Sequence, residues 1–98
     1  MPGCDHFISM PISDITISNK LGLHARAAAK LTQLASKFVS EIFISRGAQR
    51  VNAKSIMGVM MLAAGQGVTV RLEASGGDAD QALSEIQHLF DSKFGEHE

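Results

Sequence analysis

Apolar and polar residues follow regular periods along most of the chain after Pro11. Polar and apolar residues alternate in residues 14–18 and 68–73, which is the period of a half-buried strand and predicts a strand in each segment. Two further short segments, 41–45 and 49–53, flank a turn that contains Gly47, and they predict a β-hairpin. Apolar positions recur every three or four residues in three stretches that indicate helices with one buried face: 25–37, 56–63 and 79–90. The pattern predicts the element order β-α-β-β-α-β-α.

This order, with polar outer faces on the strands, predicts an α+β fold. We expect a four-stranded, mostly antiparallel sheet with all three helices on one face, which is an open-faced β-sandwich. Ser55 stands at the N-cap position of the second helix, and Asp78 is expected to cap the third, with Gln81 reaching back. Fraying is expected from Ser92. The predicted organisation is a disordered tail over 1–11, one domain over 12–94 and a frayed C-terminus over 95–98.

Length and composition limit the classes of function that the chain can have. It has 98 residues, of which 45% are hydrophobic and 19% are charged, and its net charge is −1. A single small domain of this composition buries a modest core, which favours chemistry at the surface over a deep cavity. The charge balance argues against binding to a nucleic-acid backbone. No nucleic-acid partner is therefore predicted.

The N-terminal segment and the cysteine content bear on the location of the protein. The chain does not begin with a basic region before a long apolar run, and no apolar stretch reaches the ~20 residues that span a bilayer. The one cysteine, Cys4, cannot form an internal disulfide. We expect a cytoplasmic protein without membrane insertion, for which Met10 is an alternative start. His6, His88 and His97 lack metal-ligand spacing with one another or with Cys4, so no metal or cofactor is predicted.

His24 is the strongest candidate for chemistry, because it follows a Gly-containing loop and stands at the predicted start of the first helix. The first turn of a helix presents unpaired N–H groups and a partial positive charge, so the backbone of Ala25 and Ala27 can hold a phosphate there. Arg26 adds a guanidinium with paired donors for phosphate oxygens. The same field disfavours a protonated imidazole, and a neutral ring nitrogen is the nucleophile for a phosphoryl group. On spacing alone, a surface or helix-cap role is the commoner one for such a histidine.

Two segments together resemble one known family. Residues 19–28, Asn-Lys-Leu-Gly-Leu-His-Ala-Arg-Ala-Ala, resemble the active-site segment of HPr, the histidine-containing phosphocarrier of the bacterial phosphotransferase system. Residues 52–60, Asn-Ala-Lys-Ser-Ile-Met-Gly-Val-Met, resemble the regulatory-serine region of the same family, at the family's separation from the histidine. The resemblance spans about residues 15–90, and the family's element order is the one predicted above.

The resemblance implies a phosphoryl carrier and not an enzyme. Enzyme I, charged from phosphoenolpyruvate, would phosphorylate His24 on Nδ1, and the phosphate would pass to an enzyme IIA domain. Arg26 would stabilise the phosphate. The family usually has proline after the arginine, where this chain has Ala27. Alanine preserves the helix start and supplies one more N–H to the anion site, so we expect activity to persist, with a change in how rigidly the loop is held.

Ser55 and the apolar residues after it are the candidates for regulation and docking. From the residues alone, Ser55 is most often an N-cap; the resemblance implies a regulatory phosphorylation site that a serine kinase or phosphorylase would serve. A phosphate there would add roughly −1.5 to −2 of charge beside Ile56 and Met60 and weaken partner binding. The helix is too short to bury every apolar side chain. Part of the methionine cluster of Met57, Met60 and Met61 is therefore predicted to face solvent as a docking surface, and Ile56, Met57 and Met60 are its candidate docking residues.

Other functions can be drawn from the same residues. A nitrogen-branch carrier of the family would share them, and the ending over 89–95 looks somewhat like that branch. A non-carrier regulatory module would use only Ser55 or the protein surface, and His24 and Arg26 argue against it. A hydrolase with His24 as a base would lack a Ser or Cys nucleophile in the motif. We predict a monomeric carrier whose partners are enzyme I and enzyme IIA domains.

Overall fold

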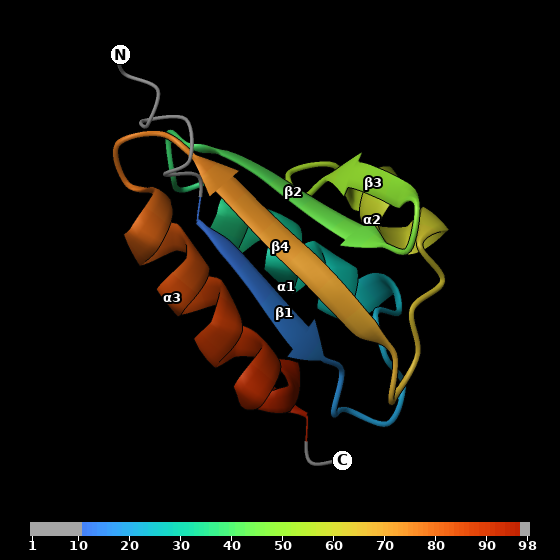
Figure 1. The fold of residues 1–98 in the computed structure, drawn as a ribbon. Helices are drawn as coiled ribbons and strands as arrows, with labels where there is room; N and C mark the ends of the chain where they lie inside the picture. The colour runs from blue at the N-terminus through green and yellow to red at the C-terminus, as the bar shows by residue number, and fades with distance from the viewer. Residues whose placement is uncertain (1–10, 97–98) are drawn as a thin grey trace.

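The last strand in the sequence lies in the middle of the sheet, whose order is β1-β4-β2-β3 with every neighbouring pair antiparallel (Figure 1). The structure is a computed structural model that describes residues 11–96. Its elements are β1 (Ile12–Thr16), α1 (Ala25–Ala35), β2 (Glu41–Arg46), β3 (Gln49–Asn52), α2 (Ile56–Met61), β4 (Thr69–Ser75), α3 (Ala79–Asp91) and a short 3-10 turn, η2 (Lys93–Gly95). In Figure 1, α1 and α2 lie behind the sheet and α3 runs beside β1. The predicted open-faced sandwich is confirmed.

Strand register places the aliphatic residues of alternating positions on one face. Ile15 of β1 lies opposite Val70 of β4, and Leu72 of β4 lies opposite Ile44 of β2. All four side chains are buried, because the helices cover this face. The period-two pattern of the strands therefore fixes which face carries the core.

The opposite face of the sheet is polar and carries cross-strand pairs. Arg71 donates to Asp14 across β4 and β1 at 2.8 Å, and this hydrogen bond holds the pKa of the Asp14 carboxyl below its ordinary value. Arg50 donates to Glu73 at 2.7 Å and lies over the Phe43 ring, 3.8 Å from its centroid. These pairs suit a sheet face that no helix covers.

The core lies between the sheet and the helices. Its largest fully buried apolar side chains come from every layer of the fold: Ile17, Leu31, Ile42, Ile44, Val59, Leu62, Val70, Leu72, Ile86, Phe90 and Phe94. Within residues 11–96, no helix combines the length and the apolar character needed to cross a bilayer.

Asp78 does not cap α3 with its side chain, which corrects the prediction. Its carboxylate instead accepts hydrogen bonds from the backbone N–H groups of Val39 and Ser40, both at 3.0 Å, and from the Ser40 hydroxyl. The bond from Ser40 keeps the pKa of Asp78 below its ordinary value. Gln81 donates to Glu85 on the same helix and does not reach back. The carboxylate ties the turn before β2 to the start of α3.

The predicted fraying from Ser92 is not observed for residues 93–96, which are ordered by contacts with α1 and α3. The η2 turn buries Phe94, whose ring packs edge-on against Phe90 with the centroids 4.8 Å apart. Lys30 of α1 donates to the Phe94 carbonyl at 2.5 Å. The apolar stripe of α3 thus continues one step beyond the helix, and it holds the C-terminal turn against α1. Residues 97 and 98 lie outside the described part of the chain, as do residues 1–10 of the predicted tail over 1–11.

Candidate functional site

A tight loop between β1 and α1 sets the position of His24. Asn19 is fully buried, and its side-chain Nδ2 donates to the Gly22 carbonyl at 2.9 Å. Gly22 takes φ +65°, and a Cβ at this position would lie 2.5 Å from the Ala64 carbonyl oxygen. The next residue, Leu23, is buried and donates its backbone N–H to the same Ala64 oxygen at 2.9 Å. The loop therefore packs directly on the segment that follows α2 and delivers His24 to the start of α1 at a fixed place.

His24 is the N-cap residue of α1. Its backbone is extended, with φ −73° and ψ 178°, its carbonyl accepts the first intrahelical bond from Ala28 at 2.8 Å, and its side chain makes no capping hydrogen bond. The N–H groups of Ala25, Arg26 and Ala27 are the first three of the helix, which have no intrahelical acceptor. No acidic side chain occupies the first turn. This end of the helix therefore keeps its donors and its partial positive charge for an anion.

The side chains around this helix start differ in exposure. The His24 side chain is 27% exposed, so the ring is reachable from solvent while one side of it rests on protein. Arg26 is exposed and, within residues 11–96, takes part in no ion pair, which leaves its guanidinium available to an anion. Ala27 is fully buried, and its methyl group packs into the core where the family usually has proline.

Sequence reasoning missed one residue of the site, Glu96. Its Oε2 is hydrogen-bonded to Nε2 of His24, and its Oε1 accepts from Asn19 Nδ2 at 3.1 Å. The hydrogen bond from His24 is the largest cause that holds the pKa of the Glu96 carboxyl below its ordinary value, and the bond from Asn19 adds to it. The signal that could have found it is Phe94, an apolar residue four positions after Phe90. That spacing continues the α3 stripe and predicts a docked C-terminal turn.

The fold that carries this site is shared with known proteins along nearly its whole length. The family model for the PTS HPr component phosphorylation site matches residues 13–92. The chain belongs to the HPr family. It is 60% identical over 85 residues to the phosphocarrier protein HPr of Cupriavidus necator, a match that covers 87% of this chain and 96% of that protein. It is 52% identical over 82 residues to the phosphocarrier protein NPr of Shewanella violacea, which covers 84% of this chain and 90% of the relative.

Solved structures agree with the family assignment. The crystal structure of HPr-C-His from Thermoanaerobacter tengcongensis superposes with a TM-score of 0.88 at 48% sequence identity, covering 91% of this chain and all of the other. A second structure from the same organism is described as an HPr dimer, with a TM-score of 0.72 and 51% identity over 84% of this chain and 94% of the other. The family that residues 19–28 and 52–60 indicated is therefore confirmed.

The second predicted region of this HPr-family chain lies at α2. Ser55 is its N-cap, with Oγ accepting from the Gly58 N–H at 3.2 Å, as predicted. Ile56, Met57 and Met60 are all exposed, and Met57 most of the three at 69%. Val59, also in α2, is fully buried. We call the exposed set Ile56, Met57, Met60 and Met61 the α2 patch.

The loop contacts bring the two predicted regions together. The hydrogen bond from Leu23 to Ala64 joins the residue before His24 to the segment that leaves α2. Leu21, in the same loop, is 65% exposed and adds an apolar side chain on the histidine side of this junction. The loop before His24 is thus in direct contact with the segment that leaves α2, and α1 and α2 also pack against each other.

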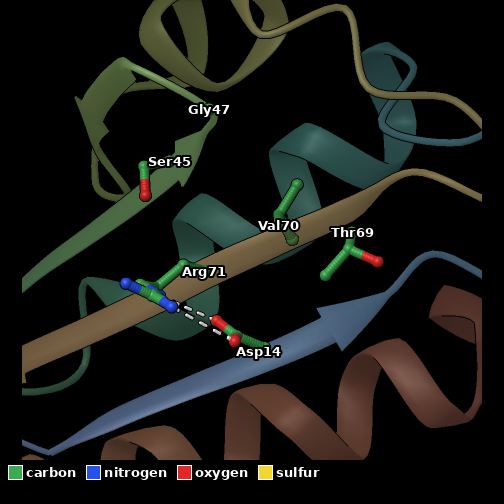
Figure 2. A pocket seen from close by; sticks show the side chains of 6 residues that line it. All are labelled: Asp14, Ser45, Gly47, Thr69, Val70 and Arg71. Atoms are coloured by element: carbon green, nitrogen blue, oxygen red, sulfur yellow. Dashed lines mark hydrogen bonds and ion pairs between the residues drawn. The ribbon is translucent and has the colours of Figure 1, made fainter.

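A pocket on the uncovered face of the sheet contains none of the predicted site residues. Figure 2 shows its lining, in which Arg71 and Asp14 pair across β4 and β1 and Thr69, Ser45 and Gly47 lie around them. Val70 also lines the pocket, although its side chain lies on the buried face of β4. The guanidinium and the carboxylate that could bind a ligand there already satisfy one another. This pocket therefore offers a charged ligand less than the start of α1, where the first N–H groups have no intrahelical acceptor.

Proposed function

We propose that the chain is a phosphoryl carrier of the phosphotransferase system, which accepts phosphate on His24 from phosphorylated enzyme I and passes it to enzyme IIA. The observation that carries the proposal is the position of His24. Its ring is partly exposed at the N-terminus of α1, beside three N–H groups that have no intrahelical acceptor. Phosphoryl transfer needs a nitrogen nucleophile and donors for phosphate oxygens at one place, and this helix start supplies both.

In the proposed transfer, the bonds formed and broken involve only His24, the phosphoryl group and enzyme I, so no cofactor is needed. The lone pair of His24 Nδ1 forms a bond to phosphorus, while the bond between phosphorus and the donor atom of enzyme I breaks and its electron pair returns to that atom. The three phosphate oxygens then face the N–H groups of Ala25, Arg26 and Ala27, and the Arg26 guanidinium supplies paired charged donors. Transfer to enzyme IIA is the reverse displacement, so the chain ends as it began. It is a carrier and not an enzyme.

The α2 patch is the proposed docking surface for both partners. Flexible methionine side chains next to the reacting histidine suit a carrier that must fit a donor and an acceptor of different structure. Ser55 borders the patch, so a phosphate from a serine kinase would place about −1.5 to −2 of charge at its edge and weaken docking. A monomer in the cytoplasm meets these partners by diffusion.

Labelling of His24 tests the central proposal. Incubation with enzyme I and radiolabelled phosphoenolpyruvate should give an acid-labile, alkali-stable label, because protonation makes the phosphorylated ring a better leaving group. His24→Ala should take no label. His88→Ala, which removes an exposed histidine from α3, is the matched control and should be labelled like the wild type. Undiminished labelling of His24→Ala, or an acid-stable label, would overturn the proposal.

The choice between branches of the family is tested in the same assay. The identity of 60% is to a protein named HPr and that of 52% to one named NPr, so we favour the sugar-uptake HPr role over a nitrogen-branch carrier or a non-carrier regulatory module. Faster labelling by the sugar-branch enzyme I than by its nitrogen-branch counterpart is the expected result. The opposite preference would assign the chain to the nitrogen branch.

A further inference from the structure

The C-terminal turn is anchored to α1 and α3 by contacts that fix where Glu96 lies. Phe94 is fully buried against Phe90, and its carbonyl accepts from Lys30 of α1. The Glu96 N–H donates to the Lys93 carbonyl at 2.9 Å, which closes the turn. The carboxylate of Glu96 is therefore held at a defined point beside the start of α1, although it stands 72 residues from His24 in the sequence.

Both oxygens of this carboxylate are occupied by site residues. Oε1 accepts from Asn19, which is fully buried and also supports the loop before His24, and Oε2 meets His24 Nε2. The bonds from these two side chains and the nearby charge of Lys30 lower the pKa of the Glu96 carboxyl, so it is ionised at neutral pH. An ionised carboxylate can only accept hydrogen bonds. The hydrogen of a neutral His24 ring must therefore be on Nε2.

We propose that Glu96 is a positioning residue that holds the neutral ring of His24 in the Nε2–H tautomer and leaves the lone pair on Nδ1 for the incoming phosphoryl group. The inference rests on the proposed phosphoryl-carrier function and adds a residue to it. Glu96 acts through the histidine, because a hydrogen bond to one ring nitrogen decides which nitrogen carries the proton. The His24 side chain makes no capping bond to the helix. The hydrogen bond between Nε2 and Glu96 therefore leaves Nδ1 uncommitted.

The tautomer matters because it decides whether transfer needs a proton acceptor. In the Nε2–H form, Nδ1 bonds to phosphorus without losing a proton, and the hydrogen stays on Nε2 between the ring and Glu96. In the Nδ1–H form, the same bond requires that a proton leave Nδ1 first. The positive charge that the ring gains on phosphorylation also lies next to the carboxylate, which stabilises it. When the phosphate departs, the pair of electrons returns to Nδ1 and the Nε2–H form is restored.

The first experiment reads the tautomer in the unphosphorylated protein, so it does not depend on the proposed function. Long-range proton–nitrogen NMR of the ring at mildly alkaline pH should show Nε2–H as the dominant form of His24 in the wild type. Glu96→Gln should populate the Nδ1–H form as well, because the amide can donate to Nε2 as well as accept from it. Glu41→Gln, the same change on an exposed glutamate at the far end of β2, should leave the ring unchanged. A dominant Nδ1–H form in the wild type, or an unchanged tautomer in Glu96→Gln, would overturn the inference.

The second experiment measures phosphate gain from enzyme I. Glu96→Gln should lower the maximal rate on the order of tenfold, the low end of the loss seen when the carboxylate behind a metal-ligating histidine is removed. KM should change little, because the α2 patch is intact. Glu96→Asp should recover part of the rate, and Glu41→Gln all of it. A loss confined to KM would mean that Glu96 serves docking, which contradicts the proposal. An absence of label in the wild type would refute the carrier function, while the tautomer result would still stand.

Discussion

Replacement of Gly22 by alanine tests whether the loop before His24 is fixed by its contact with the segment after α2. Gly22 has φ +65°, and an added Cβ would lie 2.5 Å from the Ala64 carbonyl oxygen and 2.6 Å from Gly65 Cα. Both neighbours are backbone atoms, so neither can rotate away, and the loop itself must move. The first interaction lost by such a movement is the hydrogen bond from Leu23 to Ala64, at 2.9 Å.

The expected cost of this change is the sum of two parts. The left-handed conformation costs an alanine roughly 1–2 kcal/mol, of which about 0.4–1 kcal/mol is offset because alanine restricts the unfolded chain. Loss of a backbone hydrogen bond adds about 0.5–1.5 kcal/mol. We therefore expect Gly22→Ala to lower the free energy of unfolding by about 2 kcal/mol.

Gly47→Ala is the matched control for the conformational part. Gly47 has φ +60°, and among the described residues no atom would lie within 4 Å of a Cβ placed there. We expect Gly47→Ala to lower the free energy of unfolding by about 1 kcal/mol or less. The melting temperatures of Gly22→Ala and Gly47→Ala should therefore differ by roughly 4–8 °C. Thermal and urea unfolding measure both variants, and the labelling rate with enzyme I should fall only in Gly22→Ala. Equal unfolding of the two variants, with unchanged labelling of both, would refute the argument that this contact positions His24.

Three further outcomes are expected. Arg26→Ala should unfold like the wild type, because the Arg26 side chain is exposed. It should transfer phosphate more slowly in both directions, because the proposed partner of the guanidinium is the phosphate. Unchanged transfer kinetics would contradict this role. Ser55→Asp and Met60→Glu should each bind enzyme I more weakly in a titration followed by amide shifts, with the His24 region still competent; equal affinities would make α2 structural only. Glu96→Gln should be less stable than the wild type above pH 4.5, the ordinary pKa of the carboxyl. Because the folded pKa is depressed, that difference should vanish as the pH falls through the folded value. A difference that persists in acid would contradict the argument that hydrogen bonds from His24 and Asn19 stabilise the ionised carboxylate.

Much of the fold and part of the site followed from patterns within single segments. The period of two around Ile15 and Val70 and the period of 3.6 in α1 and α3 determined the element order, because each period selects the face that is buried. Ser55 was predicted as an N-cap because a capping hydroxyl bonds an N–H only three residues away. The placement of His24 at a helix start is local in the same way, so its chemistry could be argued before any tertiary contact was known.

The contacts that the sequence left undetermined join residues far apart in the chain. Asp78 has the local sequence of a helix cap, yet its carboxylate binds the N–H groups of Val39 and Ser40, which the fold brings within 3.0 Å. Glu96 stands in a polar ending with no periodicity of its own, and only the burial of Phe94 brings it to His24. Sequence periodicity reports which face of a segment is apolar, whereas the partner of a polar side chain depends on which donors the folded chain places beside it. The proposed phosphoryl acceptor, His24, could therefore be selected from the sequence, whereas its carboxylate partner, Glu96, is a property of the tertiary structure.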